Sequence, residues 1–177
     1  MKLKESKKTE QNYILLIIGL VFYLFILCAF LFFKTNSFQS VNLIPFYTIT
    51  DYLSNGGIIS LINVLGNIVL FIPLGIYLIL FNHNKRIFIN TLWSVIISVA
   101  VEILQYLFKV GATDIDDIIL NGLGGFLGIV IYKIICKIFK DKVKYTIGLI
   151  SIIAGITFLI LSICFSSGVF GIKIRIL

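Results

Sequence analysis

Residues 87–108 read IFINTLWSVIISVAVEILQYLF, a mostly apolar run that is long enough to cross a bilayer as a single helix. Polar residues recur along this run and just after it at steps of three or four, the period of one helix face: Asn90, Ser94, Ser98, Glu102, Gln105 and Lys109. A carboxylate inside a span costs roughly 2.5–3.5 kcal/mol on insertion scales, so Glu102 needs a partner or water. We therefore treat Glu102 as a candidate functional residue; the alternative is a protonated side chain that only bonds a neighbouring helix.

The composition of the whole chain agrees with a membrane protein. The 177 residues are 59% hydrophobic and 13% charged, with a mean hydropathy of +1.09. Soluble domains are nearer 45–50% apolar and about 25% charged. These values exclude a disordered tail, a collagen-like fibre and a disulfide scaffold, and they disfavour a soluble enzyme. The single histidine, His83, excludes a multi-His metal centre, and three cysteines without a CxxC pair disfavour zinc. We expect neither metal nor cofactor.

Further apolar runs of similar length occur at residues 13–33, 58–81, 113–139 and 145–165. Together they predict an all-α, polytopic integral membrane bundle of about five transmembrane helices. We divide the chain into a basic N-terminal tail (1–12), a transmembrane domain (13–165) and a short C-terminal tail (166–177).

The basic residues set the expected orientation. The chain has 15 Lys and Arg residues and a net charge of +7. Eleven of these cations fall on the side of the N-terminal tail and four on the other side, so the positive-inside rule predicts an N-terminus inside the cell. Because the cations cluster between apolar runs, we expect no nucleic-acid partner.

Polar residues of two neighbouring runs are predicted to lie at the same level as Glu102. At 1.5 Å per residue, Asn63 and Asn67 lie about 7 and 13 Å from the outer end of their helix, and Glu102 lies about 9 Å from its own. Asn121 follows Asp117 by about 6 Å by the same rise. These amide and carboxyl side chains therefore share the outer half of the predicted bundle.

Three acids open the run at residues 113–139. Thr113 is expected to cap the helix, and acids in a first turn favour the helix dipole. Asp116 is the one that we interpret as purely structural. Asp114 and Asp117 are expected to point along the face of Asn121.

Two acids that lie close together in a low-dielectric site do not both ionise at low cost. We therefore expect Glu102 to keep its proton and Asp117 to stay charged, accepting hydrogen bonds from Asn121 or Lys109. Small residues on the same helices are interpreted as packing positions, where helices approach closely: Ser94, Ser98, Gly125 and Gly128.

The segment at residues 34–57 is the longest expected outer loop, and its centre, VNLIPFY at residues 41–47, is strongly apolar. Two interpretations remain open. The loop is either a re-entrant or surface-lying lid over the outer ends of the helices, or an ordinary aromatic anchor at the membrane interface.

Four blocks of sequence, in this order, resemble the VanZ family, named for an accessory teicoplanin-resistance protein of Gram-positive bacteria. The blocks are NLIPF at 42–46, GNIVLFIPLG at 66–75, EILQ at 102–105 and DIDDIILN at 114–121. The resemblance is strongest over residues 41–130. One departure stands out, because relatives often carry an arginine in the loop before the aspartates, where this chain has Lys109.

The resemblance implies a multi-pass protein of the bacterial plasma membrane that is associated with lowered susceptibility to glycopeptide antibiotics. It implies no established reaction. The family's motif residues correspond to Asn42, Pro45, Asn67, Glu102, Gln105, Asp114, Asp117 and Asn121.

The favoured hypothesis is an accessory protein of the cell envelope that binds at the outer leaflet. Its partners would be membrane lipids, a lipid-linked envelope precursor or a lipoglycopeptide. The expected ligand-binding residues carry amide or carboxyl groups: Asn42, Asn63, Asn67, Gln105, Asp114 and Asn121.

Two alternatives stay open. A membrane enzyme would use Glu102 or Asp117 as general acid or base on a lipid-linked substrate, with a divalent ion on Asp114 and Asp117 as one option. No nucleophile accompanies these acids. A proton-coupled carrier would use Glu102 as its proton site, but the polar set stops near mid-membrane and the sequence has no internal repeat.

Overall fold

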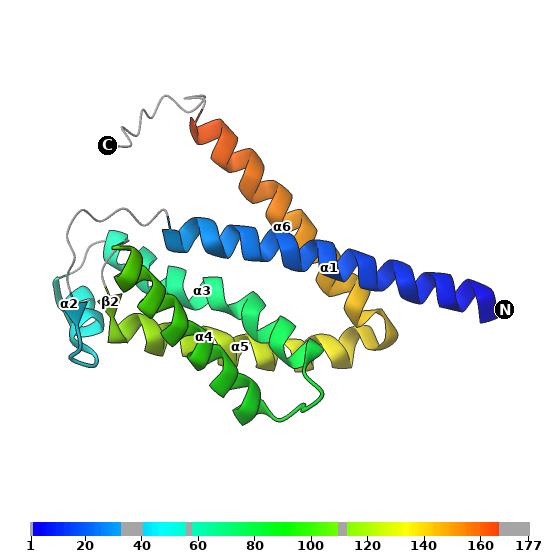
Figure 1. Cartoon of the computed structure of the whole chain (residues 1–177), viewed down its shortest axis with the longest axis horizontal. Helices are drawn as coiled ribbons and strands as arrows, with labels where there is room; N and C mark the ends of the chain where they lie inside the picture. The colour runs from blue at the N-terminus through cyan, green and yellow to red at the C-terminus, as the bar shows by residue number, and fades with distance from the viewer. Residues whose placement is uncertain (1, 33–40, 56–57, 110–112, 167–177) are drawn as a thin grey trace. The chain divides into compact units, whose positions relative to one another are not determined.

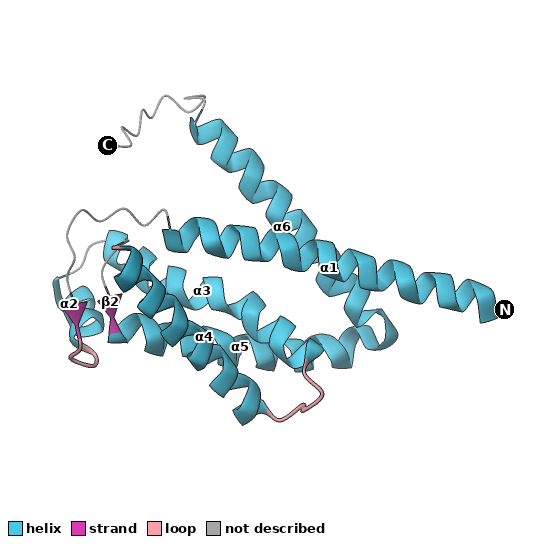
Figure 2. Ribbon diagram, viewed as in Figure 1, coloured by secondary structure: helices cyan, strands magenta, loops and turns pink. Residues whose placement is uncertain are grey.

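The computed structural model describes residues 2–32, 41–55, 58–109 and 113–166. Helices form nearly all of this part of the chain, with one small sheet (Figures 1 and 2). The elements in order are α1 (Lys2–Phe32), β1 (Val41–Asn42), α2 (Tyr47–Asn55), α3 (Ile58–Phe81), α4 (Ile87–Phe108), β2 (Thr113–Asp114), α5 (Ile115–Phe139), the 3-10 helix η1 (Lys140–Lys142) and α6 (Val143–Ser166). A helix is therefore present at each of the apolar runs.

Four stretches of the described residues are long and apolar enough to span a membrane. They are Glu10–Ala29, Val64–Phe81, Ile87–Phe108 and Ile115–Ile160. The last is 46 residues long and includes α5, η1 and most of α6, which the sequence predicted as two helices. The predicted fold class, an all-α bundle of membrane-spanning helices, is confirmed, and the chain is a membrane protein.

The chain forms two compact units. One comprises the described residues of 1–26 and 141–177, and the other comprises those of 27–140. In the first unit α6 packs on α1 through small residues. A Cβ added at Gly148 or Gly155 would press against α1, so these glycines allow the two helices to approach closely.

The second unit contains α3, α4 and α5, and its centre is a contact between the backbones of α3 and α5. A Cβ added at Gly75 would overlap the carbonyl of Gly125, and one at Gly124 would overlap the carbonyl of Ile68. A Cβ at Gly128 would meet another carbonyl of α3. Side chains are thus excluded along this line of contact, which confirms the packing role predicted for Gly125 and Gly128.

Helix α4 joins this contact through a small side chain of its own. The fully buried Ser94 lies where a Cβ of Gly125 would be. Apolar side chains complete the interior of the unit, and Phe71 and Ile129 are among those fully buried. Periodic small residues therefore fix how close the three helices come, and apolar side chains fill the space beside them.

A small parallel sheet, which the sequence did not predict, ties the loop before α2 to the start of α5. Val41 pairs with Thr113 and Asn42 pairs with Asp114. Helix α5 therefore begins at Ile115, after the strand, rather than near Thr113. The expected long loop at 34–57 contains β1 and α2, and α2 contacts both α3 and α5.

Candidate functional site

Polar side chains gather at the end of the second unit where α3 and α5 begin and α4 ends. Figure 1 shows α2 and β2 at this same end. The buried polar or charged residues here include Glu102, Gln105, Asp114, Asp116 and Asn121. Asn63, also a predicted site residue, lies in α3, but its side chain falls outside those that the structure describes.

Asp114 holds the loop before α2 with its carboxylate. Oδ1 accepts a hydrogen bond from the Asn42 amide at 3.1 Å, and Oδ2 accepts one from the Thr48 hydroxyl at 2.5 Å. Oδ1 also accepts from the backbone N–H of Asp116 at 2.9 Å, which makes Asp114 the N-cap of α5. The expectation that Thr113 caps this helix was wrong, because Thr113 pairs in the sheet. The Asp114 carboxylate faces the loop rather than Asn121.

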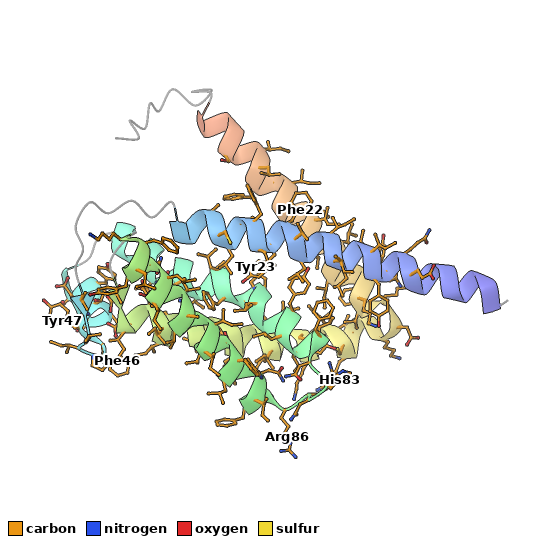
Figure 3. All side chains as sticks on the ribbon, viewed as in Figure 1. Phe22, Tyr23, Phe46, Tyr47, His83 and Arg86 are labelled. Carbon is orange, nitrogen blue, oxygen red and sulfur yellow. The ribbon has the colours of Figure 1, made fainter. Side chains whose placement is uncertain are left out.

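Asp116 is fully buried and caps a helix from 70 residues away. Its Oδ1 accepts from the backbone N–H of Phe46 at 2.5 Å, and its Oδ2 accepts from that of Ile49 at 3.1 Å. These two amides flank Tyr47, the first residue of α2, and Figure 3 labels Phe46 and Tyr47. The contacts agree with the structural role predicted for Asp116, although the helix that it caps is α2, which the sequence did not indicate.

Glu102 and Asp117 connect different elements from those two aspartates. Oε2 of Glu102 accepts from the backbone N–H of Asp114 at 3.2 Å, which joins α4 to β2. The side-chain amide of Asn67 donates to the Asp117 carboxylate, which joins α3 to α5. Gln105 is buried one turn beyond Glu102 on α4. Of the residues that the sequence placed in the outer half of three helices, Glu102, Asn67 and Asp117 therefore lie at one end of the unit.

Asn121 bonds deeper in the unit than predicted. Its side-chain amide donates to the Ser98 hydroxyl at 2.9 Å, within the buried contact between α4 and α5. The donor to Asp117 is Asn67, not Asn121 as expected. Lys109 is exposed and ends α4 in the left-handed conformation, with φ of 57°. Its backbone N–H caps the last turn of the helix.

The periodic polar residues of α4 make hydrogen bonds at both ends of the helix. Asn90 is fully buried at the end opposite Glu102 and accepts from the Asn82 amide at 3.0 Å. Its own amide donates to the carbonyl oxygens of Asn84 at 2.8 Å and Arg86 at 2.7 Å, which closes the turn between α3 and α4. Asn90 therefore has a structural role. Residues on the same polar face of α4 thus have different roles at the two ends of the helix.

Thr48 is a site residue that the sequence analysis missed. Its hydroxyl joins Asn42 and Asp114, yet it lies on no polar stripe and no spacing singles it out. The available signal was its position two residues after the NLIPF block. Among the residues described, no three His, Cys, Asp or Glu side chains are grouped so as to hold a metal ion.

The fold and this end of it define a polytopic membrane protein with a buried network of carboxylates and amides where three spanning helices meet. Comparisons with known proteins identify the class further. The VanZ/LLP1 family model matches residues 13–137. Protein VanZ of Enterococcus faecium is 30% identical over 123 residues, which cover 70% of this chain and 69% of that protein.

The chain belongs to the VanZ/LLP1 family, and the resemblance seen in the sequence is confirmed. No solved structure matches it. Every residue of the network described above, from Asn42 to Asn121, lies inside the matched region. The family links the chain to glycopeptide resistance, and the enterococcal relative fits the Gram-positive origin implied by the sequence.

Proposed function

We propose that the protein acts in the bacterial plasma membrane as an accessory protein of glycopeptide, notably teicoplanin, resistance. It binds a lipid or lipid-linked ligand of the cell envelope at the outer end of α3, α4 and α5. Family membership supports the link to resistance. The excess of Lys and Arg on the N-terminal side supports the orientation, with the polar network near the outer leaflet.

The observation that carries this proposal is the position of Glu102, Asp117 and Asn67 at the same end of membrane-spanning helices. Polar side chains at such depth are expensive and are usually retained for function. Carboxylates accept hydrogen bonds and repel phosphate, whereas amides both donate and accept. Such a set suits the sugar hydroxyls or peptide amides of a lipid-linked ligand better than its phosphate groups.

A drug-susceptibility assay tests the role of these residues. A sensitive strain would express each variant at matched membrane levels, and teicoplanin susceptibility would be measured. Asn67→Ala and Gln105→Ala should abolish the protective effect while leaving the amount of folded protein nearly unchanged. His83→Ala is the matched control, because His83 is exposed in the turn between α3 and α4. Equal loss of folded protein and of protection would instead favour a packing role.

Native mass spectrometry of the detergent-purified protein tests the ligand. A bound undecaprenyl or glycolipid species, lost in Asn67→Ala and Gln105→Ala, would support the proposal. A bound lipid whose mass differs between the wild type and Glu102→Gln would support the enzyme hypothesis. An empty protein that transports a solute in liposomes would support the carrier hypothesis.

Accessibility to an impermeant thiol reagent tests the orientation. Asp51→Cys on α2 should react in intact cells, whereas His83→Cys should react only after lysis. The reverse pattern would contradict an outer position for the network.

A further inference from the structure

The loop between β1 and α2 presents a run of apolar side chains to its surroundings. Leu43 is 68% exposed, Ile44 64%, Phe46 57% and Tyr47 59%, and Pro45 between them is exposed as well. Figure 3 labels Phe46 and Tyr47 at this end of the unit. Contiguous exposed apolar residues mark a contact surface more often than a solvated loop.

Three backbone N–H groups of this loop donate hydrogen bonds inside the protein. The amides donate as follows: Ile44 to the Asn42 side chain at 3.1 Å, Phe46 to Asp116 at 2.5 Å and Tyr47 to the Ile44 carbonyl at 3.3 Å. Pro45 has no N–H to satisfy. A non-helical segment meets the bilayer at low cost only when its backbone polar groups are bonded within the protein. Ile44, Phe46 and Tyr47 meet this requirement with their N–H groups.

The base of the loop is bonded at a level inside a membrane-spanning helix. The N–H of Asp114, whose residue pairs with Asn42 at the base, donates to Glu102. Glu102 lies six residues before the end of α4 at Phe108, about 9 Å along the helix axis. Near this end α4 exposes large apolar side chains, Leu107 at 66% and Phe108 at 65%. The exposed loop and these exposed apolar side chains of a membrane-spanning helix therefore lie at the same end of the unit.

We propose that residues 43–47 form a preorganised apolar wedge that inserts into the bilayer at this end of the helices. Asp116 fixes the wedge by holding two backbone amides, and Asp114 fixes its base through Asn42 and Thr48. The occupant is lipid, because the base of the wedge is bonded to Glu102, inside a helix that is long and apolar enough to span a membrane and that exposes large apolar side chains at this end. Aromatic residues such as Phe46 and Tyr47 favour this interfacial zone. The inference requires only that the helices span a membrane, and it stands apart from the ligand proposal.

Tryptophan fluorescence in vesicles tests the wedge. The chain has a single tryptophan, Trp93, so a Trp93→Phe background allows one new reporter at a time. The full chain would be reconstituted in phosphatidylcholine–phosphatidylglycerol vesicles with or without brominated acyl chains. Tyr47→Trp is the wedge reporter, and Ile44→Trp is a second one. Tyr106→Trp on the exposed face of α4 is the lipid control, and His83→Trp is the water control.

The expected result is that brominated lipid quenches Tyr47→Trp to the same extent as Tyr106→Trp, and that aqueous iodide quenches it far less than His83→Trp. Ile44→Trp should behave in the same way, so a variant that fails to purify as a monodisperse peak leaves the other to report. Strong iodide quenching without quenching by brominated lipid overturns the proposal. Shielding from both quenchers that increases with the protein-to-lipid ratio also overturns it, because a second copy would then cover the loop.

Discussion

Two regions of the same three-helix unit hold α3 and α5 together by opposite means. Gly75 and Gly125 bring the backbones into contact because neither has a side chain. About two turns earlier in both helices, Asn67 and Asp117 meet through a hydrogen bond between their polar side chains. The only role of the glycine region is to let the two helix backbones approach closely. The polar region keeps chemical groups between the helices, which packing by itself does not require.

A similar contrast exists inside the polar region. The carboxylates of Asp114 and Asp116 serve the loop and helix α2 through bonds to residues 42–49. Those of Glu102 and Asp117 join the spanning helices and β2. Four acids that are neighbours in the family motifs therefore divide into a pair that shapes the wedge and a pair that faces the bundle interior.

The largest effect is expected from Gly128→Ala, which breaks the glycine region. The added Cβ meets a backbone carbonyl of α3, which cannot move aside as a side chain can. Such overpacking typically costs about 1–3 kcal/mol, so we expect a marked loss of folded protein. Gly66→Ala on α3 is the matched control, because nothing lies within 4 Å of its added Cβ. Size-exclusion chromatography after heating would measure both variants, and equal stability would disprove the close backbone contact.

A smaller effect is expected from Asp116→Ala, which breaks the pair of acids that shapes the wedge. The backbone N–H groups of Phe46 and Ile49 then lose their acceptor. Because Phe46 is exposed, water can replace the acceptor there, and the net loss should be about 1 kcal/mol. The bundle should remain folded while hydrogen exchange speeds up over residues 44–50. Asp51→Ala, on the exposed side of α2, is the control. Unchanged exchange in Asp116→Ala would show that the wedge is held by other contacts.

The sequence predicted what depends on local pattern and missed what depends on distant pairing. Apolar length predicted the helices, and helical spacing of three and four residues predicted the packing of Gly125 and Gly128. Counting residues along each helix also placed Asn67 and Asp117 in the same half of the bundle. No local signal pairs Asn42 with Asp114, because 72 residues separate them and each strand has only two residues. For the same reason the N-cap of α5 was assigned to Thr113 instead of Asp114, and the cap that Asp116 makes on α2 was not predicted.

A still smaller effect on stability, with a larger one on function, is expected from Glu102→Gln. An amide oxygen can accept the bond from the backbone N–H of Asp114, so stability should change by less than about 1 kcal/mol. Protection against teicoplanin should be lost if Glu102 transfers a proton, and largely kept if it only makes hydrogen bonds. Asp117→Asn should weaken protection in both cases. Full protection by both variants would contradict a carboxylate-based site. The polar region would then serve only to hold the helices together, as the glycine region does.

The smallest effect on stability concerns Lys109, at the edge of the polar region. This residue adopts a left-handed conformation with φ of 57° at the end of α4, where glycine is the favoured residue. Lys109→Gly should therefore stabilise the protein slightly, by up to about 1 kcal/mol, because it relieves the conformational penalty of a side chain there. A rise in the midpoint of thermal unfolding, measured in detergent, would show it.

Lys109 is also the cation that precedes the aspartates of β2 and α5 in the sequence, so its charge has to be separated from its backbone role. Lys109→Arg keeps the charge and the left-handed strain, whereas Lys109→Gly removes both. If the cation serves the ligand, Lys109→Gly should raise thermal stability yet lower teicoplanin protection, and Lys109→Arg should preserve protection. If Lys109 only ends the helix, both variants should protect as well as the wild type. Equal protection by both variants would mean that the functional region ends at Gln105, inside α4. The exposed turn after α4 would then have only a structural role.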